Sequence, residues 1–186
     1  MFVVKKNYYL YIDNTHVINL NNFKKNKKIT VIYRAHVSEF DIKKIHILKK
    51  NCHKKGFKFY IANNYKLAIK CKADGLYLSS YNKKLIYQNK IKLMGSAHNY
   101  KEIYEKYKQG CTTIILSRIF RTHYENKISF FGVIKFNLIL KKFKFNVVPL
   151  GGINSSNLLK LNLVGSKGLA LMSEIKKKPV IANRLF

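Results

Sequence analysis

The chain has few acidic residues and no apolar run long enough to cross a membrane. Only 8 of its 186 residues are Asp or Glu, against 37 Lys or Arg, which gives a formal net charge of +29. No apolar stretch approaches the roughly 18 residues that a membrane helix requires. The segment after Met1 also lacks an apolar core followed by a small-residue cleavage site. These absences predict a cytoplasmic protein without a membrane span or a secretory signal.

Cysteine is also scarce. Cys52, Cys71 and Cys111 lie far apart in the sequence and form no C-x-x-C pair. An odd number of isolated cysteines argues against a disulfide framework. We therefore expect three buried or half-buried thiols.

The scarcity of arginine limits what the positive charge can mean. Arginine occurs only at Arg34, Arg118, Arg121 and Arg184, whereas proteins that read bases and phosphates favour its bidentate side chain. Lys, Asn, Ile, Tyr and Phe are abundant together, a bias that AT-rich coding produces. A basic nucleic-acid-binding protein is therefore only a distant alternative.

The clearest pattern in the chain is a strand, a helix and a second strand near its end. The apolar run Val147–Leu150 ends at two glycines, which predicts a buried strand that leads into a turn. Asn154 is placed to cap a helix over 155–163. A second apolar run, Leu169–Met172, predicts the next strand.

Small residues follow both of these strands. Gly151 and Gly152 come after the first strand, and Ser173 comes after the second. Backbone N–H groups and a hydroxyl at such positions can hold an anion without a base or a metal. Since the glycines could also serve only to close a tight turn, both interpretations stay open.

The rest of the chain alternates between strand and helix patterns, without a repeat or a linker, so we expect one domain over 1–186. The segment 16–28 predicts only a short or irregular helix. The other predicted strands are 8–12, 29–33, 58–61, 75–78, 92–95 and 113–116. The other predicted helices run from 42 to Gly56, over 65–72, from Asn99 to Gly110 and over 132–142.

Five short motifs, in this order, resemble the thiamine phosphate synthase and thiazole tautomerase family. They are YLYID at 9–13, MGSAH at 94–98, IFRT at 119–122, GGI at 151–153 and ALMSEI at 170–175. The likeness therefore covers nearly the whole chain. It implies a compact α/β TIM (β/α)₈ barrel with some short or irregular helices and a site at the C-terminal ends of the strands.

Synthases of this family join a pyrimidine diphosphate to a thiazole phosphate and release pyrophosphate, with magnesium bridging the diphosphate. The family pattern Gln-x-Arg-x-Lys for the diphosphate keeps only its arginine here, because Ile32 and His36 occupy the other places. The resemblance implies these substrate-binding residues: Arg34, Ser96, Thr122, Gly151, Gly152 and Ser173.

The metal half of the family site is altered. Asn63 and Asn82 stand where the family places its two metal-binding aspartates. Magnesium prefers carboxylate oxygens, and neutral amides replace them poorly. Magnesium is therefore implied by the resemblance alone, we predict no metal ligands here, and we expect a synthase of weak or altered activity.

Two other functions stay open. A thiazole phosphate tautomerase needs one acid–base group, for which His98, His123 and His36 are candidates; the tautomerases' own histidine falls at Arg118. A non-catalytic binder of thiamine phosphate needs no such group. In each case we expect a small phosphorylated ligand as partner and no membrane or nucleic acid, while the oligomeric state, including a homo-oligomer, stays open.

Overall fold

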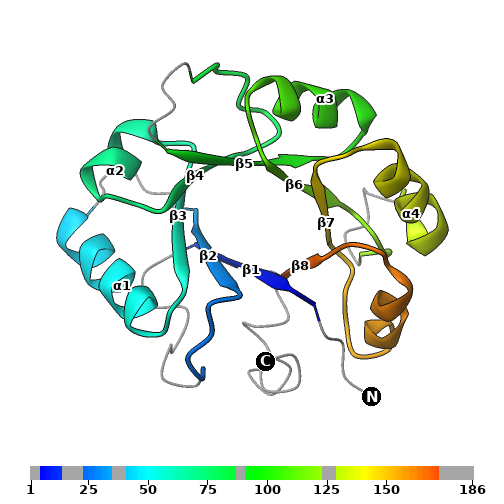
Figure 1. The fold of residues 1–186 in the computed structure, drawn as a ribbon, viewed down its shortest axis with the longest axis horizontal. Helices are drawn as coiled ribbons and strands as arrows, with labels where there is room; N and C mark the ends of the chain where they lie inside the picture. The colour runs from blue at the N-terminus through cyan, green and yellow to red at the C-terminus, as the bar shows by residue number, and fades with distance from the viewer. Residues whose placement is uncertain (1–4, 14–22, 35–40, 87–90, 123–128, 172–186) are drawn as a thin grey trace.

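Eight parallel strands form a barrel in the computed structural model, which describes residues 5–13, 23–34, 41–86, 91–122 and 129–171. Figure 1 shows the strands as a ring with the helices outside it. The strands are β1 Asn7–Ile12, β2 Ile29–Tyr33, β3 Lys58–Ala62, β4 Gly75–Leu78, β5 Lys92–Ala97, β6 Thr113–Ser117, β7 Asn146–Leu150 and β8 Gly168–Leu171. The helices are α1 Ile42–Lys54, α2 Tyr65–Lys70, α3 Tyr100–Lys108, α4 Gly132–Lys142 and the 3₁₀ helix η2 Leu158–Leu163.

The hydrogen-bonded order of the strands is β7-β6-β5-β4-β3-β2-β1-β8. The two end strands, β7 and β8, also contact each other, which brings the sheet round into a nearly closed barrel. Pro149 lies in β7, in keeping with the preference of proline for strands at the end of a ladder. The predicted TIM barrel with short helices is therefore confirmed.

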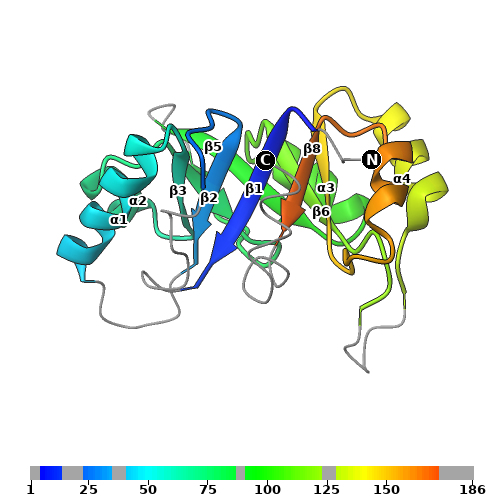
Figure 2. The ribbon, with the colours of Figure 1, turned by 90° about the horizontal axis from the view of Figure 1, so that it is seen from below.

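Parallel strands place all their C-terminal ends at one edge of the barrel. In Figure 2 the arrowheads of β1, β2 and β8 point toward the same, lower edge. Every predicted strand is present, with ends within two residues of the prediction. No helix in the described part of the chain is both long and apolar enough to cross a membrane.

Side chains cap the N-termini of the helices α1 and α3. At the start of α1 the Asp41 carboxylate accepts a hydrogen bond from the Lys44 N–H at 3.1 Å. Asn99 caps α3 in the same way, accepting from the Glu102 N–H at 2.9 Å. Both contacts satisfy an N–H group that has no partner inside the helix.

The helix predicted over 155–163 is wrong in type and in extent. The Asn154 side chain accepts hydrogen bonds from the N–H groups of Ser156 at 3.0 Å and Asn157 at 3.2 Å, which makes a turn. Asn157 in turn donates to the Gly152 carbonyl at 2.7 Å. Because these side chains bind the backbone locally, only the 3₁₀ helix η2 follows.

Tyrosines fill much of the barrel interior, where branched aliphatic residues are more usual. Tyr60 shows how the sequence makes room for them, since a Cβ atom on Gly75 would lie only 2.0 Å from its ring. The interior residues are Tyr9, Tyr11, Ile32, Tyr60, Tyr77, Met94, Ile115, Val148 and Ala170. A second, larger apolar core separates the sheet from the helices.

Candidate functional site

The turn after β7 packs tightly against the segment that follows β6. Gly151 and Gly152 have φ angles of 94° and 71°, in the left-handed region that favours glycine. A Cβ atom on Gly152 would lie 2.3 Å from the Phe120 carbonyl oxygen. The two glycines are therefore required by the fold, whether or not an anion binds them.

The same turn presents N–H groups at the C-terminal edge. The carbonyl of Gly151 accepts from the Phe120 N–H at 3.1 Å. By contrast, the N–H groups of Gly151, Gly152 and Ile153 donate no hydrogen bond to any residue that the structure describes. Successive N–H groups in a left-handed turn form a concave site that suits a phosphate or carboxylate.

Arg118 brings a positive charge to this turn, and sequence reasoning did not select it as a binding residue. Its guanidinium donates to the Thr122 hydroxyl and to the Ser129 carbonyl, both at 3.0 Å. A Cβ on Gly151 would lie 2.9 Å from the Arg118 Cγ atom, so the arginine stem lies against the turn. Arg118 could have been selected from the sequence, because arginine is rare in this lysine-rich chain and this one closely follows a predicted strand.

We call Arg118, Thr122, Gly151 and Gly152 together the phosphate half of the site. Three of these were predicted, and the structure brings them together. Ser173, the remaining predicted member, lies outside the described residues, as do the candidate bases His36 and His123.

Arg34, after β2, is already engaged with the protein. Its guanidinium lies 2.9 Å from the Asp13 carboxylate and 4.9 Å from the centre of the Tyr11 ring. Both Arg34 and Asp13 side chains are partly exposed. The arginine is therefore held in place over the barrel interior, but Asp13 offsets part of the charge that a diphosphate would need.

Ser96, predicted to contact substrate, is buried at the end of β5. Its side chain lies beside Tyr77, whose hydroxyl lies 3.1 Å from that of Tyr11. Burial raises the pKa of both tyrosines above the ordinary value, so they stay neutral at physiological pH. A row of polar side chains thus runs from Ser96 through Tyr77 to Tyr11 beneath Arg34.

Asn63 and Asn82 hydrogen-bond to each other. The Asn63 Oδ1 atom accepts from the Ser79 N–H at 2.9 Å, from the Ser79 hydroxyl at 2.9 Å and from the Asn82 amide at 3.2 Å. The Asn63 amide donates to the Tyr81 hydroxyl at 3.0 Å. The Ser79 N–H can only donate, which fixes the oxygen of Asn63 on that side.

This arrangement does not fit magnesium. The oxygen that would face the cation is surrounded by hydrogen-bond donors, which repel a positive ion, and no carboxylate of the described residues bonds to this cluster. The described residues also contain no group of three or more His, Cys, Asp or Glu side chains that could hold a metal ion. We call Arg34, Asn63 and Asn82 the diphosphate half of the site.

His98 lies on the surface just after β5 and pairs with Glu102. One carboxylate oxygen of Glu102 lies 2.8 Å from the His98 backbone nitrogen and 3.0 Å from its Nδ1 atom. Because a carboxylate can only accept, Nδ1 carries a proton and Nε2 lies on the opposite side of the ring from Glu102. His98 therefore has the orientation of a general base, at an exposed position.

A family profile described as thiamine monophosphate synthase matches residues 19–175, which is most of the chain. This chain belongs to the thiamine monophosphate synthase family. Among curated proteins, the thiamine-phosphate synthase of Prochlorococcus marinus strain SARG / CCMP1375 is 29% identical over 133 residues. That of Prochlorococcus marinus subsp. pastoris strain CCMP1986 / NIES-2087 is 28% identical over 132 residues.

These alignments cover 68% of this chain but only 38% and 37% of the two synthases. The chain therefore corresponds to less than half the length of these curated family members.

Solved structures support the same fold. A thiamine phosphate pyrophosphorylase from Pyrococcus furiosus superposes with a TM-score of 0.71 at 17% identity, covering 96% of this chain and 91% of that one. A 3-hexulose-6-phosphate synthase gives a TM-score of 0.67 at 11% identity, with 96% and 95% covered. Identities this low establish the barrel architecture alone.

Proposed function

We propose that this family member binds a phosphorylated thiazole, or thiamine phosphate, at the C-terminal edge of the barrel. The observation that carries the proposal is the row of N–H groups at Gly151, Gly152 and Ile153, against which the stem of the Arg118 side chain packs. A phosphate monoester there would accept several hydrogen bonds and meet one positive charge, the pattern that anion sites use.

We further propose that its synthase activity is weak. The family reaction must stabilise a leaving pyrophosphate, and this site offers Arg34, already paired with Asp13, and two neutral amides. Replacing a metal and several cations by one partly neutralised arginine removes several kcal/mol of transition-state stabilisation, so we expect a rate lower by about 10³-fold.

A tautomerase is the second candidate, favoured by the contact between His98 and Glu102. The Glu102 carboxylate fixes the imidazole so that Nε2 can take a proton from a bound thiazole and return it. That reaction needs no pyrophosphate stabilisation, so the altered diphosphate half would not oppose it.

The binding proposal is tested by calorimetry with thiazole phosphate. Arg118→Gln removes the cation beside the glycine turn, and we expect binding to weaken by about 10-fold or more. The control is Lys160→Gln on η2, which lowers the net charge equally at an exposed position and should leave binding unchanged. Equal affinities for wild type and Arg118→Gln would place the phosphate elsewhere.

A second experiment separates the functions. The protein is incubated with both synthase substrates and magnesium, and thiamine phosphate is measured by mass spectrometry. In parallel, NMR follows isomerisation of the thiazole phosphate for wild type and His98→Gln. Slow thiamine phosphate formation supports the synthase, isomerisation lost in His98→Gln supports the tautomerase, and binding without either product supports a non-catalytic binder.

A further inference from the structure

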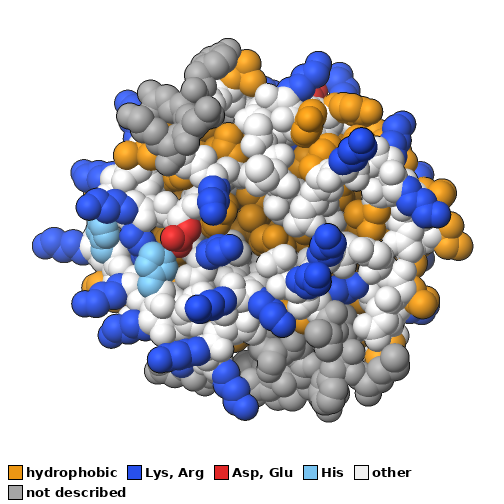
Figure 3. Space-filling view, viewed as in Figure 1, with side chains coloured by type: hydrophobic (Ala, Val, Ile, Leu, Met, Phe, Trp, Pro, Cys, Tyr) orange, Lys and Arg blue, Asp and Glu red, His pale blue; other side chains and the backbone are white. Residues whose placement is uncertain are grey.

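The opposite, N-terminal mouth of the barrel carries a concentration of lysines. Six of the eight strands begin with a lysine or follow one within two residues. The lysines at these strand starts are Lys6, Lys28, Lys58, Lys92, Lys144 and Lys167. Figure 3 shows many blue side chains of Lys and Arg grouped around the centre of this face, with little red among them.

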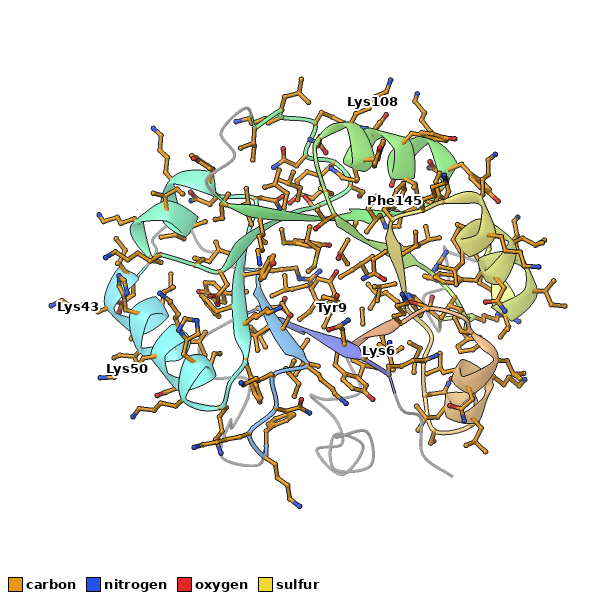
Figure 4. The ribbon with its side chains drawn as sticks, viewed as in Figure 1. Lys6, Tyr9, Lys43, Lys50, Lys108 and Phe145 are labelled. Carbon is orange, nitrogen blue, oxygen red and sulfur yellow. The ribbon has the colours of Figure 1, made fainter. Side chains whose placement is uncertain are left out.

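Several of these lysines surround the barrel axis. Residues two apart in a strand share a face, so Lys58 lies on the interior face with Tyr60, and Lys92 with Met94. In the view of Figure 4, Lys6 lies at the start of β1, beside β8, on the wall of the barrel. Both strand lysines and Lys6 are exposed, so their ammonium groups can reach an anion at the mouth.

The floor of this mouth is polar. The Tyr9 hydroxyl lies near Thr113 and Asn146, and the Asn146 amide lies 3.4 Å from the Thr113 hydroxyl. All three residues occupy the barrel-interior face near the strand starts. Hydroxyl and amide groups thus lie beneath the lysines.

Acidic side chains do not balance this charge. Among the described residues, Asp74 is the acidic side chain near the strand starts, and it is bound to the Phe59 N–H and to His53, both at 2.7 Å. Lys6, Lys58 and Lys92 form no salt bridge with an acidic side chain of the described residues. Like charges around one opening destabilise the folded state, and a bound anion would offset that cost.

Helix dipoles do not account for these lysines. Lysines in the last turn of a helix, such as Lys54 of α1 and Lys108 of α3, are stabilised by the negative end of the dipole. Lys58 and Lys92 begin strands instead, outside the last turn of a helix, where that attraction is weaker. Helix dipoles therefore do not explain why Lys58 and Lys92 lie at the strand starts.

We infer that the N-terminal mouth of the barrel binds a compact polyphosphate anion, at a site separate from the phosphate and diphosphate halves. Lysine ammonium groups are mobile point charges, which suit an anion with several charged oxygens better than a ligand read by a fixed geometry. This inference is independent of the proposed function.

The test is calorimetry with inorganic triphosphate at about 150 mM salt, where long-range attraction is screened. The variant is Lys6→Gln/Lys58→Gln/Lys92→Gln. The control is Lys43→Gln/Lys50→Gln/Lys108→Gln, which removes the same charge from lysines that point away from the barrel in Figure 4. Wild type should bind one triphosphate. The affinity of the Lys6→Gln/Lys58→Gln/Lys92→Gln variant should be about 10-fold or more lower, and that of the control should be within about 2-fold of wild type.

Three results would overturn the inference. They are absence of wild-type binding, equal weakening in both variants, and a single-stranded oligonucleotide that binds more tightly than triphosphate and loses affinity equally in both variants. The last result would indicate diffuse binding of nucleic acid by net charge. Circular dichroism and the melting temperature verify that each variant folds. The affinity for thiazole phosphate is measured separately, as a check that the C-terminal mouth of the barrel is unchanged.

Discussion

The phosphate half and the diphosphate half of the C-terminal site differ in whether their polar groups have hydrogen-bond partners within the protein. In the phosphate half, N–H groups of the glycine turn have no acceptor among the described residues. In the diphosphate half, Arg34 pairs with Asp13, and Asn63 pairs with Ser79 and Asn82. A site whose polar groups satisfy one another gains less from a ligand than one whose donors lack partners. This difference supports the proposal that the glycine turn binds an anion, whereas the polar groups of the diphosphate half already stabilise the fold by bonding one another.

The largest expected effect is at the glycine turn. Gly152→Ala places a Cβ 2.3 Å from a backbone carbonyl at a φ of 71°. We expect a loss of about 3 kcal/mol in the free energy of unfolding, from left-handed strain and overpacking together. Denaturant unfolding measures it.

Gly132→Ala is a matched control, because Gly132 has a φ of 67° but no atom within 4 Å of its added Cβ. It should lose only the strain, about 1 kcal/mol. Equal losses at the two positions would mean that the turn is not tightly packed against Phe120.

A smaller effect is expected when the metal carboxylates are restored. In Asn63→Asp/Asn82→Asp the side chains that now bond at 3.2 Å become like charges. We expect the double variant to be less stable than wild type without magnesium, and magnesium to raise its melting temperature by several degrees. Magnesium-dependent turnover should rise by about 10-fold or more.

Wild type supplies the comparison for this variant. Its melting temperature should be unchanged by millimolar magnesium. A clear magnesium shift in wild type, or none in the double variant, would contradict the assignment of Asn63 and Asn82 to the lost metal site.

The barrel interior beneath both halves should respond to alkali. Burial raises the pKa of Tyr60 to about 12, so the folded state keeps a proton that the unfolded state loses near pH 10. This stability is fully present below about pH 10 and is lost as the pH rises toward 12. At pH 11 the loss from one such group is about 1 kcal/mol.

Tyr60→Phe should therefore reduce the alkaline loss of unfolding free energy between pH 8 and 11 by about 1 kcal/mol. The control is Tyr104→Phe, since Tyr104 is exposed on α3. If Tyr60→Phe leaves the slope unchanged, Tyr60 does not titrate with unfolding.

The sequence predicted the strands well because each is a short apolar run buried on both faces. It placed the end of β5 at Gly95 rather than Ala97, since Ser96 and Ala97 lack the bulk that marks a buried strand. It also extended the helix after β7, because an apolar pattern does not reveal that the Asn154 side chain accepts from the local backbone and the Asn157 side chain donates to it. Local side-chain chemistry decided these boundaries.

The site was harder to predict than the fold. Family motifs indicated Thr122 and the glycine turn, which are adjacent in the structure, but not Arg118, whose role depends on contacts with Gly151 and Ser129 distant in sequence. Asp13 was likewise missed as the partner of Arg34. Such pairings join residues that follow neighbouring strands, so they depend on the tertiary structure.

Steady-state turnover of wild type with and without magnesium tests the central claim most directly. An intact metal and diphosphate half should give a turnover of about 1 per second or above. We predict turnover about 10³-fold below that, with little dependence on magnesium, alongside normal binding of thiazole phosphate. Magnesium-dependent turnover of about 1 per second or more, not improved by Asn63→Asp/Asn82→Asp, would contradict the claim and identify an ordinary synthase.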